Sequence, residues 1–148
     1  MRALLGRLLG AAPHELPALG WAFAYFFLLL CSYYVLRPVR DAMAAGAGAD
    51  DLQWLFSATF AAMLALVPLF GWLCARLPRA RLLPAVYGFF ALNLVGFSFS
   101  PNPYLFFVWL SVFNLFVVSV FWSFMSDLFD AAQAGRLYGV IAAGGSCG

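Results

Sequence analysis

The sequence contains three charge-free apolar runs that are long enough to cross a lipid bilayer. They cover residues 16–36, 52–75 and 82–126 and are 21, 24 and 45 residues long. About 20 apolar residues make one transmembrane helix, because a helix rises about 1.5 Å per residue and the hydrocarbon core is about 30 Å thick. The composition agrees, since 66% of the residues are hydrophobic and 9% are charged. We therefore predict an all-α integral membrane protein and exclude a soluble domain, a disordered tail and a nucleic-acid-binding module.

The third run is too long for a single span and contains the turn signal Ser-Pro-Asn-Pro at residues 100–103. Dividing it there predicts four transmembrane helices at residues 16–38, 52–75, 82–99 and 104–126. A last apolar run at 137–148 reaches only about 18 Å and is too short to cross the bilayer. We expect an N-terminal arm at 1–15 and a transmembrane bundle fragment at 16–148, with four helices and the start of a fifth. A short re-entrant or interfacial segment is the alternative for the last run.

The arginines predict how these helices are oriented. Six of the eight basic residues fall on the side that holds the N-terminus: Arg2, Arg7, Arg76, Arg79, Arg81 and Arg136. Arg37 and Arg40 fall on the opposite side. Cytoplasmic loops carry the excess of Lys and Arg, so we expect a cytoplasmic N-terminus in a multi-pass protein. The absence of Lys beside abundant Ala and Gly suggests a GC-rich genome, and with it a bacterial inner membrane.

The outer end of the first predicted helix gathers the polar residues that point most directly to a function. Tyr33, Arg37 and Arg40 are spaced i, i+4, i+7 and share one helical face, and Asp41 lies one turn from Arg37. Guanidinium groups match phosphate and carboxylate geometry, and paired arginines at a broken membrane helix are a recurring way to hold an anion. We therefore expect Tyr33, Arg37, Arg40 and Asp41 to contact a small anionic solute.

Pro38 leaves alternatives open for this segment. A proline removes a backbone donor and disfavours helical geometry at the residue before it, which predicts a kink or break. The helix could also end at Leu36, with both arginines as interfacial anchors whose side chains reach for water. It could equally continue to Asp41 and carry both arginines inside.

Two further places carry candidate polar residues. Asn114 lies well inside the fourth predicted helix, where it either bonds a neighbouring helix or contacts a substrate. The basic loop after the second helix is either an orientation signal or a cytoplasmic gating loop. It resembles the signature between helices 2 and 3 of the major facilitator superfamily, through Gly71, Arg76, Arg79 and Arg81. Its acidic position falls on Ala75 and its second glycine on Pro78.

The residues predict no enzyme, cofactor or metal site. Ser146 lies in a Gly-rich run, but a serine nucleophile needs a nearby base and the single histidine, His14, lies in the N-terminal arm. The three cysteines lie far apart in apolar runs, so we interpret them as packing residues. Gly144 and Gly148 form a small-xxx-small pair that permits close helix contact.

Segments at residues 33–41, 68–72, 113–125 and 135–139 resemble a bacterial branch of the ATP/ADP translocase family, which lies within or near the major facilitator superfamily. The resemblance extends from about Trp21 to Gly148 and implies the N-terminal part of a twelve-helix bundle. In its nucleotide-exchanging members the first helix ends in Leu-Arg-x-x-Lys-Asp, which places Arg37, Arg40 and Asp41 at the Arg, Lys and Asp positions. Those members also need an acidic residue in helix 4, where this chain has Asn114.

The leading functional hypothesis is thus a secondary transporter fragment that moves a small organic anion by alternating access. Nucleotide antiport is the best guess from the resemblance. We expect the lipid bilayer, the anion and a missing C-terminal transmembrane lobe as its partners. The alternatives are an exporter of another solute, such as a drug or amphiphile, and a truncated membrane protein that does not transport.

Overall fold

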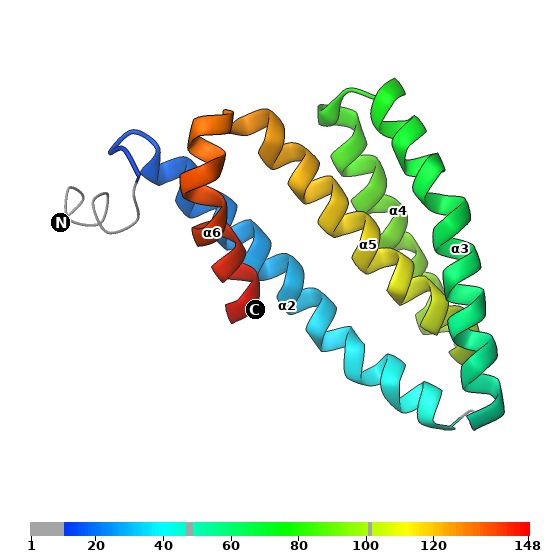
Figure 1. Ribbon diagram of the computed structural model, residues 1–148. Coiled ribbons are helices and arrows are strands. Elements are labelled where there is room, and N and C mark those ends of the chain that lie inside the picture. Colours follow the sequence, from blue (N-terminus) through cyan, green and yellow to red (C-terminus); the bar gives the residue numbers. More distant parts are fainter. Residues whose placement is uncertain (1–10, 47–48, 101) are drawn as a thin grey trace. The chain divides into compact units, whose positions relative to one another are not determined.

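The computed structural model describes residues 11–46, 49–100 and 102–148, and every regular element among them is a helix (Figure 1). The five helices follow the chain in the order α2 (Leu16–Gly46), α3 (Ala49–Arg76), α4 (Arg79–Phe99), α5 (Pro103–Leu128) and α6 (Ala131–Cys147). The first four are long and apolar enough to cross a membrane. Within the described residues this confirms the predicted all-α class and gives four helices that could span a membrane, which is consistent with a membrane protein.

Two helix boundaries differ from the predicted ones by six residues or more. Helix α2 runs through Pro38 without a break and ends at Gly46, eight residues beyond the predicted end. The alternatives that end or break the helix at residues 36–38 are therefore wrong. Helix α6 begins at Ala131, six residues before the predicted start, because Asp130 caps it. The Asp130 carboxylate accepts a hydrogen bond from the Gln133 backbone N–H at 2.8 Å. The Gln133 side-chain oxygen accepts one from the Asp130 backbone N–H at 3.0 Å.

The chain divides into two compact units, which we describe separately. The terminal unit contains the chain up to Tyr34 together with Phe121–Gly148, and the central unit contains Val35–Val120. Helices α2 and α5 each contribute to both units.

In the terminal unit, α6 lies beside the first half of α2 and runs in the same direction (Figure 1). Glycines allow the close approach. A Cβ on Gly144 would lie 2.8 Å from the Phe23 carbonyl oxygen, and a Cβ on Gly148 would collide with the Phe27 carbonyl. The structure thus confirms close helix contact through the Gly144–Gly148 pair.

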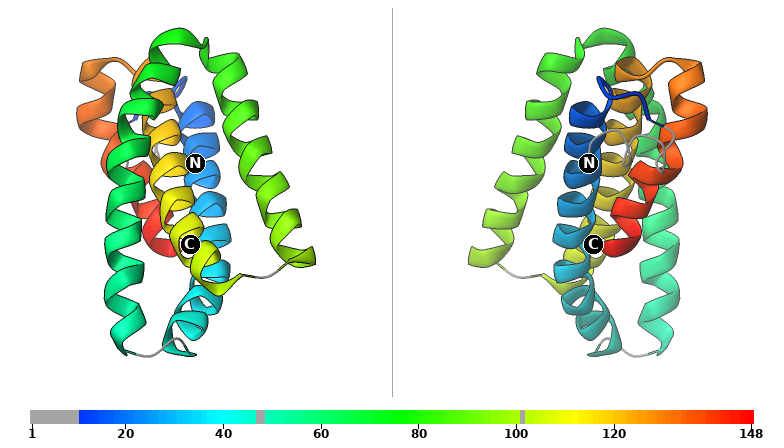
Figure 2. Two further views of the ribbon diagram at one scale, coloured as in Figure 1. Left: turned by 90° about the vertical axis from the view of Figure 1, so that its right-hand side faces the viewer. Right: turned by 90° about the vertical axis from the view of Figure 1, so that its left-hand side faces the viewer.

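In the central unit, α3 and α4 are joined by a tight connection at Leu77 and Pro78 (Figure 2). Aromatic rings hold α4 against α5: the Phe90 ring centroid lies 5.2 Å from that of Phe113 and 5.9 Å from that of Phe116. Helices α3, α4 and α5 enclose a hollow of 570 Å³ with almost wholly apolar walls, which we call the apolar groove.

Candidate anion site

Arg37, Arg40 and Asp41 form one ion-pair cluster on α2 in the central unit. Arg40 donates to Asp41 Oδ1 from Nε at 2.9 Å and from Nη2 at 2.7 Å. Arg37 Nε lies 3.6 Å from Asp41 Oδ2, one helical turn away. Two guanidinium groups therefore share one carboxylate, and the cluster carries a net positive charge. The side chain of Arg40 is 17% exposed, against 47% for Arg37 and 50% for Asp41.

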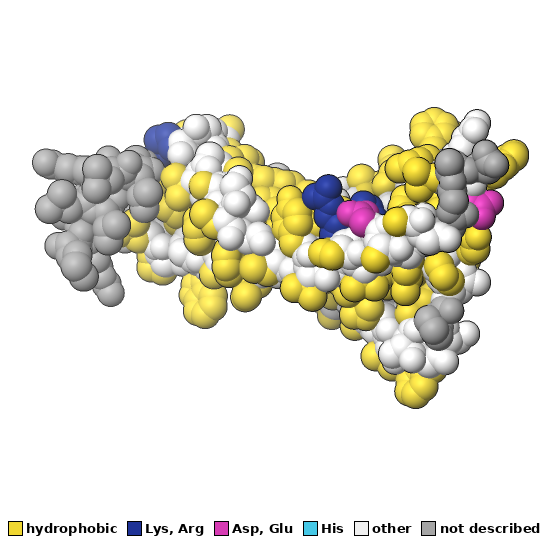
Figure 3. All heavy atoms as spheres, turned by 90° about the horizontal axis from the view of Figure 1, so that it is seen from below, with side chains coloured by type: hydrophobic (Ala, Val, Ile, Leu, Met, Phe, Trp, Pro, Cys, Tyr) yellow, Lys and Arg dark blue, Asp and Glu magenta, His cyan; other side chains and the backbone are white. Residues whose placement is uncertain are grey.

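The Arg40 guanidinium also packs on α5. Its Cζ atom lies 5.1 Å from the centroid of the Phe107 ring, within the range of a cation–π interaction. Phe107 is buried against Ala44 of α2 and Leu55 of α3, and its ring makes an edge contact with Phe56 at 5.6 Å. The face in Figure 3 is mostly hydrophobic, with basic and acidic side chains adjacent at one place. Arg40 is thus held by an ion pair and by a ring that three helices position.

Asn114 lies on the same face of α5 as Phe107, two turns further along the helix. Its Oδ1 atom is buried and has no hydrogen-bond partner among the described residues. Ser111 lies between the two, and its hydroxyl donates a hydrogen bond to the Phe107 carbonyl at 3.0 Å. At about 1.5 Å per residue, Asn114 lies about 16 Å from the start of α5, close to its middle. An unpaired amide oxygen at this depth is costly, at about 1–3 kcal/mol, which makes it a candidate ligand contact.

The structure brings part of the predicted site together, since Arg37, Arg40 and Asp41 are in contact. Asn114 lies on another helix, α5, and Tyr33, one turn before Arg37 on α2, packs its ring on Tyr34 at 5.4 Å. Sequence reasoning missed Phe107, which lies 67 positions from Arg40 and carries no polar signal.

The predicted gating loop is shorter than expected because all four of its candidate residues belong to helices. Gly71 lies inside α3 in open surroundings, and Arg81 lies in the first turns of α4. Arg76 ends α3, with its Cζ atom 5.4 Å from the Trp72 ring centroid. The side chain of Arg79 lies outside the described residues.

A second polar cluster, in the terminal unit, was not predicted. Glu15, just before α2, accepts hydrogen bonds from Ala12 N at 2.7 Å, from Gln133 Nε2 at 2.8 Å and from Arg136 Nη2 at 3.4 Å. The Ala12 bond, then the Gln133 bond and the Arg136 charge lower the pKa of Glu15, although desolvation opposes them. This cluster, which we call the Glu15 clasp, ties the start of α2 to the start of α6.

Protein-family models, curated proteins and solved structures were compared with the chain, and none of them matches it. No group of three or more His, Cys, Asp or Glu side chains among residues 11–46, 49–100 and 102–148 could hold a metal ion. The geometry of the arginine cluster is therefore the main observation on which a function can be proposed.

Proposed function

We propose that this chain is part of a secondary membrane transporter for a small organic anion, and that Arg37 and Arg40 bind the anion. The observation that carries the proposal is the shared carboxylate. Two guanidinium groups beside one carboxylate give these three residues a net positive charge, which favours the binding of a phosphate or carboxylate. The planar guanidinium donors suit both groups, and Phe107 holds the Arg40 head group in place.

The position of the cluster along α2 fits a site where an anion enters. Arg37 is about 31 Å from Leu16 along the helix, so a hydrocarbon core that begins at Leu16 ends close to the arginines. An anion arriving from water meets the pair there, and about halfway down α5 the unpaired Asn114 oxygen can accept a hydrogen bond from an N–H or O–H group of the solute. Asp41 holds the guanidinium groups when no anion is bound.

The finer identity of the transporter rests on the family resemblance. We propose the N-terminal part of a major-facilitator-like twelve-helix bundle in a bacterial inner membrane, with a cytoplasmic N-terminus. ATP and ADP are the first substrates to test. In this hypothesis Gly71, Arg76, Arg79 and Arg81 lie at the cytoplasmic end and gate access from that side. The chain is a carrier rather than an enzyme.

The experiment is uptake of labelled ATP, ADP and a panel of organic anions by proteoliposomes. They are made with the protein encoded by the complete reading frame that contains this chain. We expect uptake of at least one anion, with a loss of about tenfold or more in Arg40→Ala, as removal of a charged hydrogen bond predicts. Arg40→Lys keeps the charge but not the planar fork, so it should restore only part of the rate.

Arg7→Gln is the matched control, since it removes the same charge from the N-terminal arm and should leave uptake unchanged. Transport that is equal in native protein and Arg40→Ala contradicts the role of the arginines. Export of amphiphiles that is independent of both arginines would instead favour the exporter hypothesis.

A further inference from the structure

The wall of the apolar groove in the central unit includes a tryptophan whose polar atom has no partner among the described residues. Trp109, on α5, lines the groove, and its indole nitrogen is buried with no hydrogen-bond partner among the described residues. Its ring is fixed by four phenylalanines, with centroid distances between 5.3 and 5.9 Å: Phe90, Phe97, Phe106 and Phe113. The indole N–H is thus a hydrogen-bond donor that is held in place by its neighbours and finds no acceptor among them. It favours a ligand that carries an acceptor atom.

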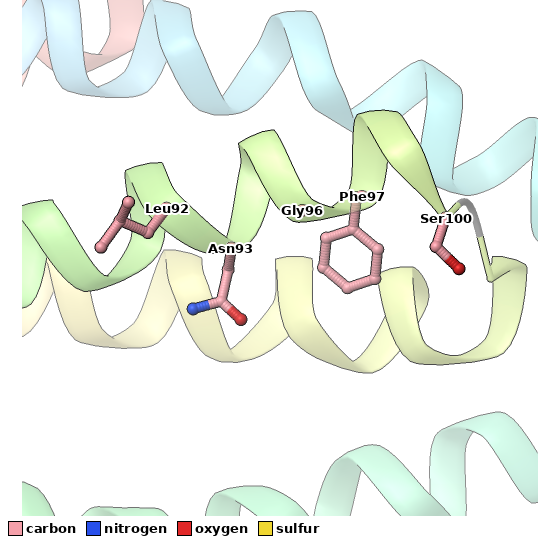
Figure 4. A pocket seen from close by; sticks show the side chains of 5 residues that line it. All are labelled: Leu92, Asn93, Gly96, Phe97 and Ser100. Carbon is pink, nitrogen blue, oxygen red and sulfur yellow. The ribbon is translucent and has the colours of Figure 1, made fainter.

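The rest of the groove is suited to hydrocarbon. Leucines of α3 and apolar side chains of α4 and α5 form its walls, and no charged residue lines it. In addition to Trp109, the polar residue Asn93 lines the groove, and its amide nitrogen donates a hydrogen bond to the Phe89 carbonyl at 2.8 Å. Figure 4 shows the Asn93 amide and the Phe97 ring on the side of α4 that faces α5. Both residues also line a shallow neighbouring hollow, next to Gly96 and Ser100. A molecule in the groove therefore needs a long apolar part and a polar group near one end.

The size of the groove suits a hydrocarbon chain. From Ala62 on α3 to Leu77 just after it, the groove is about 22 Å long. Its volume of 570 Å³ falls within the range of about 300–1,000 Å³ that is usual for small-molecule sites. A flexible hydrocarbon chain can follow a long, narrow space of this kind without moving α3 away from α4 and α5.

The depth of Trp109 identifies the polar group. Trp109 follows the start of α5 by six residues, about 9 Å, and helix side chains tilt toward the N-terminal end. Helix α5 is about 39 Å long, so centring it on the bilayer places the indole near the edge of a hydrocarbon core about 30 Å thick. The ester carbonyls that join acyl chains to glycerol lie at this edge. We propose that the apolar groove binds one acyl chain of a bilayer glycerolipid, whose ester carbonyl accepts a hydrogen bond from Trp109 Nε1.

The test uses the chain purified from bilayers and washed in detergent until loosely held lipid is gone. Native mass spectrometry then counts the lipid that stays bound. We expect one retained lipid per chain, and in competition an ester-linked diacyl lipid should exceed the matching ether-linked lipid by about fivefold. In Trp109→Phe, which keeps an aromatic ring without the N–H donor, this ester preference should disappear.

A pair of neighbouring alanines gives a matched control for the groove itself. Ala62 lines the groove, whereas the adjacent Ala61 is exposed and does not. Ala62→Phe should lose the lipid at least fivefold relative to Ala61→Phe. Absence of retained lipid, equal retention of ester and ether lipids by the native chain, or a groove closed by a second copy of the chain would overturn the proposal. The ester–ether comparison needs no variant, so it decides the matter even where Ala62→Phe does not fold. None of these readouts depends on transport.

Discussion

At the scale of single residues, local spacing could be predicted and distant partners could not. Arg37 and Asp41 are one turn apart in sequence, and the structure confirms their proximity at 3.6 Å. The Phe107 ring beneath Arg40 and the Gln133 and Arg136 partners of Glu15 come from far along the chain. A single sequence contains no signal that pairs these positions, because the pairing depends on how the helices pack.

The Glu15 clasp predicts a pH dependence of stability. Because hydrogen bonds and the Arg136 charge lower the folded-state pKa of Glu15, its contribution is complete above the ordinary value of 4.5 and is lost as the pH falls through the folded-state pKa. Glu15→Gln should therefore lower the Tm at pH 7, and the difference from the native chain should shrink as the pH drops below about 4.5. Thermal unfolding in detergent micelles at several pH values measures this. A difference that grows toward acidic pH would contradict the clasp.

At the scale of elements, hydropathy predicted the four long helices well and their ends less well. The local preference of Pro38 against helix was outweighed by the surrounding residues, so α2 continues to Gly46. The start of α6 had a readable signal that was missed, since Asp130 and Gln133 have the spacing of a capping box.

The contact between α2 and α6 gives a prediction for two glycines of one helix. Gly144→Ala places a methyl group against the Phe23 backbone, which cannot move aside as a side chain can, so we expect a loss of about 1–3 kcal/mol in the free energy of unfolding. Gly139→Ala, in open surroundings on the same helix, should be neutral or slightly stabilising. Denaturant titration of both variants in micelles tests this, and equal effects would show that the close contact does not form.

At the scale of the whole molecule, the number of helices long and apolar enough to span a membrane follows from the sequence, but their packing does not. Long charge-free runs suffice to predict four spans, because the bilayer imposes one length on every crossing. The division into two units that share α2 and α5 has no counterpart in the hydropathy pattern.

The predicted orientation can be checked on intact cells. With Cys31, Cys74 and Cys147 replaced by alanine, a new cysteine is placed at Asn102→Cys or at Leu77→Cys. Because six of eight arginines fall on the side of the N-terminus, a membrane-impermeant maleimide should label position 102 from outside and leave position 77 unlabelled. Labelling of position 77 alone would reverse the orientation and place Arg37 and Arg40 at the cytoplasmic face.

The role of Arg37 and Arg40 is tested most directly by equilibrium binding of ATP, ADP and other organic anions to the purified chain in nanodiscs. We predict that Arg40→Ala weakens binding of the recognised anion by about tenfold or more, as loss of a charged hydrogen bond implies. Asp41→Asn should tighten binding, because Arg40 loses the carboxylate that competes with the anion. Arg7→Gln should bind as the native chain does. If Arg40→Ala binds every anion with the native affinity, the arginine cluster is not an anion site.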